Sequence, residues 1–161
     1  MVVEIKEASA AQMPIIINMG KLYRYDLSEF TQWEIEADGM HRCYGFERYW
    51  CAGYYPFMVY VDAEIAGFAL LSREDETYEI DEFFILRKFR RRGVARQSAR
   101  LIFEKFKGKW LIQQLSCNSL AITFWKNLIS EVSKREYESY ETVHKEHGAI
   151  HVLRFSNEET R

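Results

Sequence analysis

The chain has 161 residues, of which 22 are lysine or arginine and 24 are aspartate or glutamate, so its formal net charge is −2. This length is typical of one globular domain, and we expect residues 1–161 to form a single domain with its own core. Apolar residues make up 48% of the chain and aromatic residues 16%, which excludes an intrinsically disordered protein. The small net charge provides no overall field that would attract nucleic acid, so we expect no nucleic-acid partner.

Cysteine and histidine spacing predicts neither a disulfide framework nor a metal site. The three cysteines, Cys43, Cys51 and Cys117, are an odd number without C-x-x-C spacing. His41 and Cys43 have no third ligand near them in sequence, so we expect no metal. The N-terminus has no apolar signal region, and the chain has no run of about 18 apolar residues. We therefore expect a cytoplasmic protein without a membrane partner.

Charge is unevenly distributed along the middle of the chain. Residues 87–109 hold ten lysines or arginines against one acid, Glu104, whereas residues 74–82 hold six acids. A basic segment beside an acidic one suits an anionic cofactor that meets a cationic substrate. The same runs are also compatible with ordinary solvated surface.

Hydrophobic periodicity divides the chain into strands and helices. Strands are predicted at residues 2–7, 57–62, 65–72, 80–86, 110–117, 137–143 and 150–155. Helices are predicted at residues 10–25, 94–106 and 119–129, with a charged loop at 73–77. Because a helix separates them, the strands at 80–86 and 110–117 should be parallel, and the remaining pairs should form antiparallel hairpins.

The segment from Tyr23 to Trp50 is the least regular part of the chain. It is rich in aromatic residues and contains two glycines, which favours short helices and loops. Its rings are compatible with a lid or pocket wall, and equally with simple completion of the core.

The stretch from Tyr78 to Ala99 combines a strand, a basic turn and the start of a helix. The turn reads Arg-Arg-Arg-Gly-Val-Ala over residues 90–95. At such a helix start, unpaired backbone N–H groups and the helix dipole favour an anion, and a glycine lets the ligand approach. The sequence therefore predicts a phosphate site here.

This stretch resembles the acyl-CoA-binding segment of the GNAT superfamily of N-acyltransferases. Arg90, Gly93 and Ala95 match the family pattern of Arg or Gln, two residues, Gly, one residue, then Gly or Ala. The order of predicted elements is similar to the GNAT fold over nearly the whole chain, within a bacterial branch of predicted acetyltransferases of unknown substrate. The resemblance implies an α/β (α+β) fold with a mixed, mainly antiparallel central sheet, flanked by helices, and a parallel splayed strand pair at the cofactor site.

The resemblance also implies a reaction and a set of binding residues. An acetyl group would move from acetyl-CoA to a primary amine of a small molecule or protein, by direct attack in a ternary complex. Backbone amides of residues 91–96 would hold the pyrophosphate, and residues 84–86 would pair with the pantetheine arm. The implied cofactor-binding residues are Phe84, Ile85, Leu86, Arg90, Arg91, Arg92, Gly93, Val94, Ala95, Arg96, Asn118, Phe124 and Trp125. A homodimer is compatible with the family.

Transfer to an amine also needs a base, and Glu82 is the candidate. It lies on the strand before the turn, where some relatives carry a catalytic glutamate, and the neighbouring Phe83 and Phe84 would raise its pKa by excluding water. Side-chain alternation along the strand predicts that Asp81 points away from Glu82. Glu82 is equally suited to bind a substrate cation or to form a structural ion pair, and a water-mediated base is a further alternative.

The second family motif departs from its usual form. Asn118, Ala121 and Phe124 match an Asn-x-x-Ala-x-x-Phe pattern, in which the Asn either caps a helix or also bonds the cofactor. Many relatives then carry a tyrosine that protonates the departing thiolate, but this chain has Trp125, whose indole is not a usable acid. Another group must therefore supply the proton, or coenzyme A leaves as a thiolate. Trp125 is also compatible with a purely structural role in the hydrophobic core. A catalytically weak acyl-CoA-binding or sensor protein is therefore the alternative function.

Two other interpretations of this region are less favoured. Cys117 lies beside Asn118, but no histidine is near it in sequence to activate the thiol, so a buried apolar filler is the simpler interpretation. Residues 87–92 are basic, but a duplex-binding site needs basic residues spread over a face.

Overall fold

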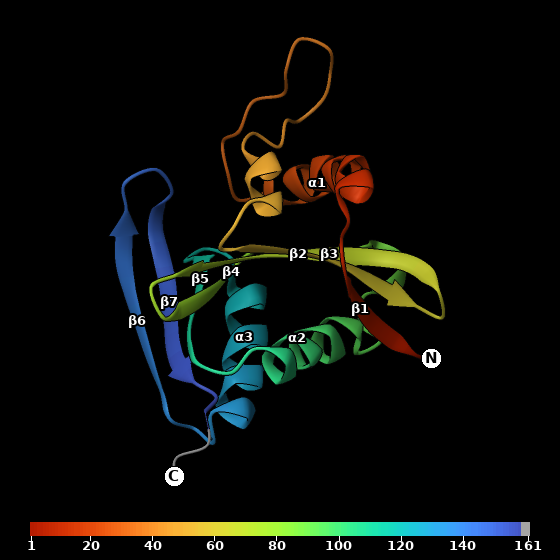
Figure 1. The fold of residues 1–161 in the computed structure, drawn as a ribbon. Coiled ribbons are helices and arrows are strands. Elements are labelled where there is room, and N and C mark those ends of the chain that lie inside the picture. Colours follow the sequence, from red (N-terminus) through yellow and green to blue (C-terminus); the bar gives the residue numbers. More distant parts are fainter. Residues whose placement is uncertain (159–161) are drawn as a thin grey trace.

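The fold is a single mixed sheet with helices on both faces, in a computed structural model that describes residues 1–158 (Figure 1). Within these residues, the strands follow the order β1-β2-β3-β4-β5-β7-β6. The strands are β1 (Val3–Glu7), β2 (Tyr54–Val61), β3 (Glu64–Glu74), β4 (Thr77–Ile85), β5 (Lys109–Leu115), β6 (Tyr137–His144) and β7 (Gly148–Ser156). The helices are α1 (Met13–Leu27), α2 (Val94–Lys105) and α3 (Ser119–Val132), with 3-10 turns η1 (Ala10–Gln12), η2 (Phe46–Trp50) and η3 (Arg87–Phe89).

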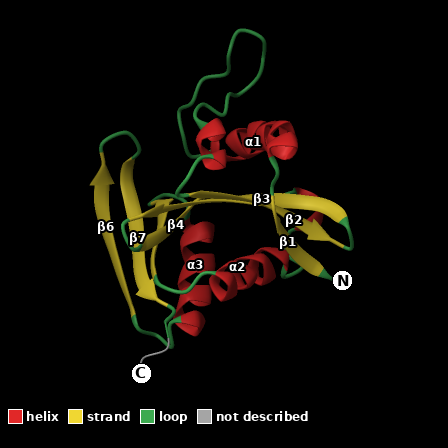
Figure 2. Cartoon of the chain, viewed as in Figure 1, coloured by secondary structure: helices red, strands yellow, loops and turns green. Residues whose placement is uncertain are grey.

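All neighbouring strands are antiparallel except β4 and β5, which are parallel. This arrangement confirms the predicted fold class, including the parallel pair. Helix α1 and η2 lie on one face of the sheet, and α2 and α3 lie on the other (Figures 1 and 2). Residues 28–45 form a long loop beyond α1.

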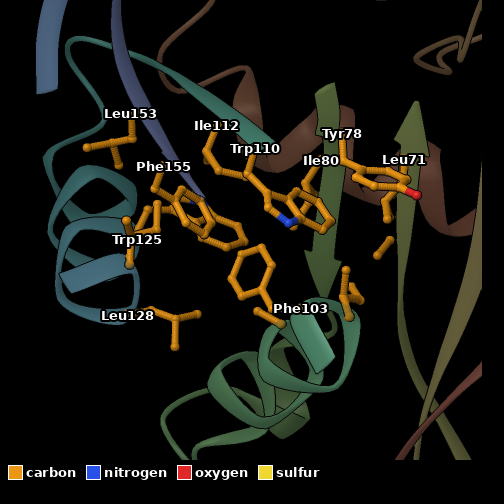
Figure 3. Close-up of a cluster of buried hydrophobic side chains, with 14 of the residues drawn as sticks. Leu71, Tyr78, Ile80, Phe103, Trp110, Ile112, Trp125, Leu128, Leu153 and Phe155 are labelled. Atoms are coloured by element: carbon orange, nitrogen blue, oxygen red, sulfur yellow. The ribbon is translucent and has the colours of Figure 1, made fainter. Parts of the chain in front are cut away.

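An aromatic core fills the space between the sheet and the pair α2 and α3 (Figure 3). The indole of Trp110 on β5 is 1% exposed, and its ring centroid lies 4.8 Å from that of Phe103 on α2. Phe155 of β7 also packs against Phe103, at 5.3 Å. Residues of this size each bury enough apolar surface to contribute roughly 2–3 kcal/mol. The core therefore fixes β5 and α3, which form one side of the site described below.

A second core holds α1 against the opposite face. Ile16 is fully buried here, and the aromatic rings of Phe46 and Phe68 meet edge to face at 6.2 Å. At Gly20, an added Cβ would lie 2.6 Å from Cys43 Sγ and 2.8 Å from the Phe46 ring. The absence of a side chain at Gly20 therefore lets the segment around residues 43–46 pack directly on α1.

The predicted helices and strands are confirmed, and their boundaries shift by a few residues. The predicted charged loop at 73–77 is wrong, because β3 extends to Glu74 and β4 begins at Thr77. Only Asp75 and Glu76 turn the chain, with Asp75 in the left-handed region at φ 52°. Among residues 1–158, no helix is long and apolar enough to cross a membrane.

Candidate active site

The parallel strands β4 and β5 separate soon after they meet. Their register covers only Thr77–Glu79 against Lys109–Leu111. Beyond this point, β4 continues beside β3 and β5 continues beside β7. The facing edges of β4 and β5 therefore open into a wedge, as the resemblance to GNAT proteins implied, and their backbone groups there are available to a ligand.

A β-bulge in β4 changes which side chains share a face. Leu70 of β3 pairs with Glu82 and Leu71 pairs with Ile80, so Asp81 is an extra residue without a partner in β3. A bulge of this kind interrupts the alternation of side chains. Asp81 and Glu82 consequently both point toward the α1 face, and the prediction that Asp81 points away from Glu82 is wrong.

The contacts of the two carboxylates show this shared face. Asp81 accepts hydrogen bonds from the hydroxyls of Tyr49 on η2 and Ser72 on β3, each at 2.9 Å. Glu82 accepts one from Arg24 Nη2 on α1 at 3.4 Å. Glu79 lies on the same face and accepts one from Gln113 Nε2 at 2.6 Å. Three carboxylates of one strand thus line one region.

A cavity of about 600 Å³ occupies the wedge and extends onto both faces of the sheet. Its walls include Gln113 and Gln114, whose side chains point to opposite faces of β5. On the α1 face it is lined by the three carboxylates and by the rings of Tyr23, Trp33, Tyr44 and Phe46. On the α3 face it is lined by Phe83, Gln114, Asn118, Ala121 and Trp125. Two ligands can therefore meet in this cavity from opposite sides of the sheet.

Burial raises the pKa values of all three carboxylates. Desolvation is the largest effect on Glu82, and Arg24 and the Tyr23 phenol partly offset it by lowering the pKa. Burial and the nearby Asp81 charge raise the pKa of Glu79 to about 7. Burial also raises the pKa of Asp81, although Ser72 and Tyr49 oppose this change. Each of these carboxylates therefore accepts a proton more readily than an exposed one does.

Arg24 partly neutralises this acidic wall. Its guanidinium lies 4.5 Å from the ring centroid of Trp33 and 5.7 Å from that of Phe46. Its side chain and that of Glu82 are 19% and 16% exposed. The alternative that Glu82 forms an ion pair is therefore realised, and the pair lies in the wall of the cavity.

The aromatic segment from Tyr23 to Trp50 contributes both to the core and to the cavity wall, the two alternatives predicted for its rings. The rings of Tyr49 and Phe46 are 0% and 2% exposed and belong to the core. Trp33 lines the cavity, and so does Tyr44, whose side chain is mostly exposed.

The basic turn has the backbone geometry of an anion site. Gly93 caps α2 in the left-handed region at φ 79°, which favours glycine. Among residues 1–158, the amides of residues 91–96 donate to no backbone carbonyl. Arg90 is held differently: its Nε donates to the carbonyl of Ile85 at 2.7 Å, and its guanidinium pairs with Asp26. Its side chain therefore braces the turn against α1 and β4.

The other arginines in and just after the turn differ in their partners. Arg96 forms an ion pair with Glu131 of α3. Arg91 and Arg92 have no ion pair within residues 1–158, and Arg91 has a positive φ of 61°. Val94 is buried at the helix start, and Ala95 packs beside it.

The predicted residues of the second motif lie on α3. Asn118 Oδ1 accepts a hydrogen bond from the amide of Ala121 at 3.2 Å, which confirms the helix cap, and its side chain also lines the cavity. Trp125 is 6% exposed and its ring lies 5.3 Å from that of Phe83. It is therefore core and cavity wall together. Phe124 packs on Phe83 at 6.5 Å.

The other predicted positions follow β4 toward the turn. Phe84 packs in the core beside α1, and Ile85 packs in a third core with Val94. Leu86 precedes η3. The prediction of a buried Cys117 is wrong: β5 ends at Leu115, and Cys117 is exposed in the turn before α3.

Sequence reasoning missed several residues of the cavity. Arg24 lies on α1 and Gln114 on β5, and neither belongs to a recognisable motif. His144 and His147, at the turn between β6 and β7, also line the cavity, and their rings stack at 4.6 Å. These residues are brought together only by the tertiary fold. No local sequence signal could have found them.

Comparison with known proteins agrees with this geometry. The sequence model of the Acetyltransferase (GNAT) family matches residues 21–128, and the chain belongs to this family. No curated protein matches the sequence significantly.

Several solved structures share the fold at low sequence identity. The chain is similar to the ribosomal-protein-S18-alanine N-acetyltransferase from Escherichia coli, with a TM-score of 0.65, 9% identity and coverage of 99% of this chain and 97% of that one. It is similar to Ard1 from Thermoplasma volcanium, with a TM-score of 0.65, 16% identity and coverage of 99% and 100%. A GNAT family acetyltransferase from Elizabethkingia anophelis with acetyl-CoA bound has a TM-score of 0.61, 14% identity and coverage of 96% and 97%.

Proposed function

We propose that this protein is an N-acetyltransferase that moves an acetyl group from acetyl-CoA to a primary amine of a small molecule or protein, by direct attack in a ternary complex. The observation that carries the proposal is the cavity through the β4–β5 wedge. It joins an acidic, aromatic wall on the α1 face to the α3 face, on which the basic turn begins α2.

The residues on the face of the sheet that carries α2 and α3 fit coenzyme A. Free amides at residues 91–96 would hold the pyrophosphate. The space beside the Gly93 Cα is open to a ligand, because a Cβ added there would approach only Gln97 Nε2, at 3.6 Å. The edge of β4 that β5 leaves unpaired, from residue 80 to residue 85, would bond the pantetheine arm. Asn118 lies beside this path. When bound, acetyl-CoA would supply the activated acyl group as a thioester.

The α1 face of the cavity fits a cationic amine. Glu82 would accept the proton that the amine loses, and burial raises its pKa, which makes it a stronger base than an exposed glutamate. Arg24 would hold the Glu82 carboxylate in place through the contact at 3.4 Å. Glu79 and Asp81, which form no ion pair within residues 1–158, would attract the positive charge of the acceptor.

A catalytically weak acyl-CoA sensor is the second candidate, because Trp125 occupies the place of the usual tyrosine acid and is packed in the core. Binding and turnover separate the two functions. A sensor would bind acetyl-CoA without transferring the acetyl group to any amine, whereas an enzyme would do both.

Calorimetric titration with acetyl-CoA tests the binding step. Gly93→Asp should abolish binding, because it places a carboxylate among the free amides. Gly39→Asp is a matched control, since Gly39 has the same φ of 79° and open space around it. The proposal expects binding by the wild type and by Gly39→Asp only. Absence of binding to the wild type, or equal binding by Gly93→Asp, would contradict it.

A further inference from the structure

Gln114 is a buried glutamine in the wall of the cavity. It lies on β5, two residues after Ile112, and its side chain therefore points to the α3 face. It is 8% exposed and shares the cavity wall with Asn118 and Trp125. Its amide nitrogen, Nε2, has no hydrogen-bond partner within residues 1–158. Buried polar groups are normally satisfied, so this donor points to a missing partner.

The opposite end of the same amide is held by a histidine. His151 of β7 lies directly opposite Gln114, and its Nδ1 is 3.4 Å from Gln114 Oε1. His151 Nε2 lies 3.0 Å from the hydroxyl of Ser139 on β6. Contacts from Ser139 through His151 to Gln114 thus connect the edge strand β6 to the cavity.

Burial favours the neutral form of His151. The ring is 5% exposed, and burial lowers its pKa, with a further decrease from Lys126 and an opposing effect of Glu141. A neutral ring carries one proton. In the tautomer that carries this proton on Nδ1, the ring donates to Gln114 Oε1 and accepts from the Ser139 hydroxyl at Nε2. The amide is then oriented with Nε2 toward the cavity.

In the acetyl transfer proposed above, none of the groups described so far stabilises the negative charge that develops on the coenzyme A sulfur. The amine nitrogen forms a C–N bond as the C–S bond breaks, the amine proton passes to Glu82, and the electron pair of the C–S bond stays on sulfur. Trp125 is not an acid and is fixed in the core by Phe83. A neutral hydrogen-bond donor on the α3 face would stabilise the thiolate without protonating it.

We propose that Gln114 Nε2 donates a hydrogen bond to the coenzyme A sulfur and stabilises the departing thiolate, and that His151 positions the Gln114 amide for this contact. This inference rests on the proposed function. The burial of Gln114, its unpartnered donor and its place across the wedge from Phe83 and Glu82 support it.

Ligand binding without turnover tests this contact. Coenzyme A and desulfo-coenzyme A, which lacks the sulfur, are titrated by calorimetry at pH 6.5 and pH 9. A donor to sulfur lowers the thiol pKa in the complex, so the thiolate binds more tightly. The affinity ratio of coenzyme A to desulfo-coenzyme A should therefore rise with pH by up to about ten-fold, which corresponds to about one pKa unit. Protein groups that affect both ligands equally cancel in this ratio.

Variants assign the effect to Gln114. Gln114→Glu keeps the shape but replaces the donor by a carboxylate, so the rise should be lost or reversed. Gln114→Leu removes both polar ends and should also abolish the rise. Ser133→Ala is the control, because Ser133 is a buried polar residue of the segment that ends α3, and its hydroxyl donates to Ile129 O outside the cavity. This control should keep the rise.

Two results would overturn the inference. One is a ratio that does not change with pH in the wild type, and the other is the same rise in the wild type and in both Gln114 variants. Either result can occur while coenzyme A still binds, and leaves the proposed function intact. If neither ligand binds, the proposed function itself fails, and this inference fails with it.

Discussion

Replacing Glu79 by Gln should make the protein more stable at alkaline pH. Glu79 is largely buried, and its pKa is raised from 4.5 to about 7 in the folded protein. The folded protein therefore binds more protons than the unfolded chain between these values, so its free energy of unfolding falls as pH rises through this window. Glutamine has the same shape, carries no charge and keeps an oxygen for the hydrogen bond from Gln113.

The expected gain in the free energy of unfolding follows from the pKa shift of Glu79. A shift of about 2.5 pKa units, at 1.36 kcal/mol per unit, corresponds to about 3 kcal/mol at pH 8, above both pKa values. At pH 4, below both values, the Glu79→Gln change should have little effect. Nearby Asp81 also titrates, so the measured gain belongs to the pair rather than to Glu79 alone.

Urea unfolding at pH 4 and pH 8 measures this difference. Glu138→Gln is the control, because Glu138 is exposed on β6 and should change the free energy of unfolding by less than about 0.5 kcal/mol at either pH. Equal stability of Glu79→Gln and the wild type at pH 8 would refute the argument that burial penalises the Glu79 charge.

Three further substitutions separate catalysis, cofactor binding and packing. Glu82→Gln should lower kcat/KM by roughly 100-fold or more while acetyl-CoA affinity measured by calorimetry stays unchanged; a smaller loss would favour a water-mediated base. In the wild type, activity should rise with pH as the Glu82 carboxyl loses its proton, at a pH above the usual glutamate pKa, because burial raises its pKa. Asn118→Ala should lower the free energy of unfolding by about 1 kcal/mol through loss of the cap, and a simultaneous loss of coenzyme A affinity would show that it also contacts the cofactor. Gly20→Ala should cost about 1–3 kcal/mol in a urea titration, because its Cβ would collide with Cys43 and Phe46; an unchanged midpoint would contradict this packing.

Local patterns were sufficient to predict the strand, turn and helix around Gly93. An apolar run, a glycine-containing basic turn and a helical periodicity are each set by neighbouring residues, and the structure has these elements at β4 and α2. The parallel pairing of β4 with β5 also followed from a local feature, the helix between them.

The site itself depends on contacts between distant parts of the chain. The bulge at Asp81 arises from the register of β4 against β3, which alternation within β4 cannot reveal. The ion pair of Arg24 with Glu82 joins residues 58 positions apart, and Gln114 meets His151 through strand pairing. Arg90 was predicted from a motif, but its contact with Asp26 on α1 appears only in the fold.

Amine-dependent release of coenzyme A from acetyl-CoA is the most direct test of the central claim. The free thiol is measured at pH 8 with a panel of cationic primary amines, including diamines and a peptide with a free N-terminus. The account predicts that thiol release depends on the amine, and that acetylated amine forms in equal amount. Acetyl-CoA binding without amine-dependent release across the whole panel would contradict catalysis at the β4–β5 wedge and would favour the sensor function.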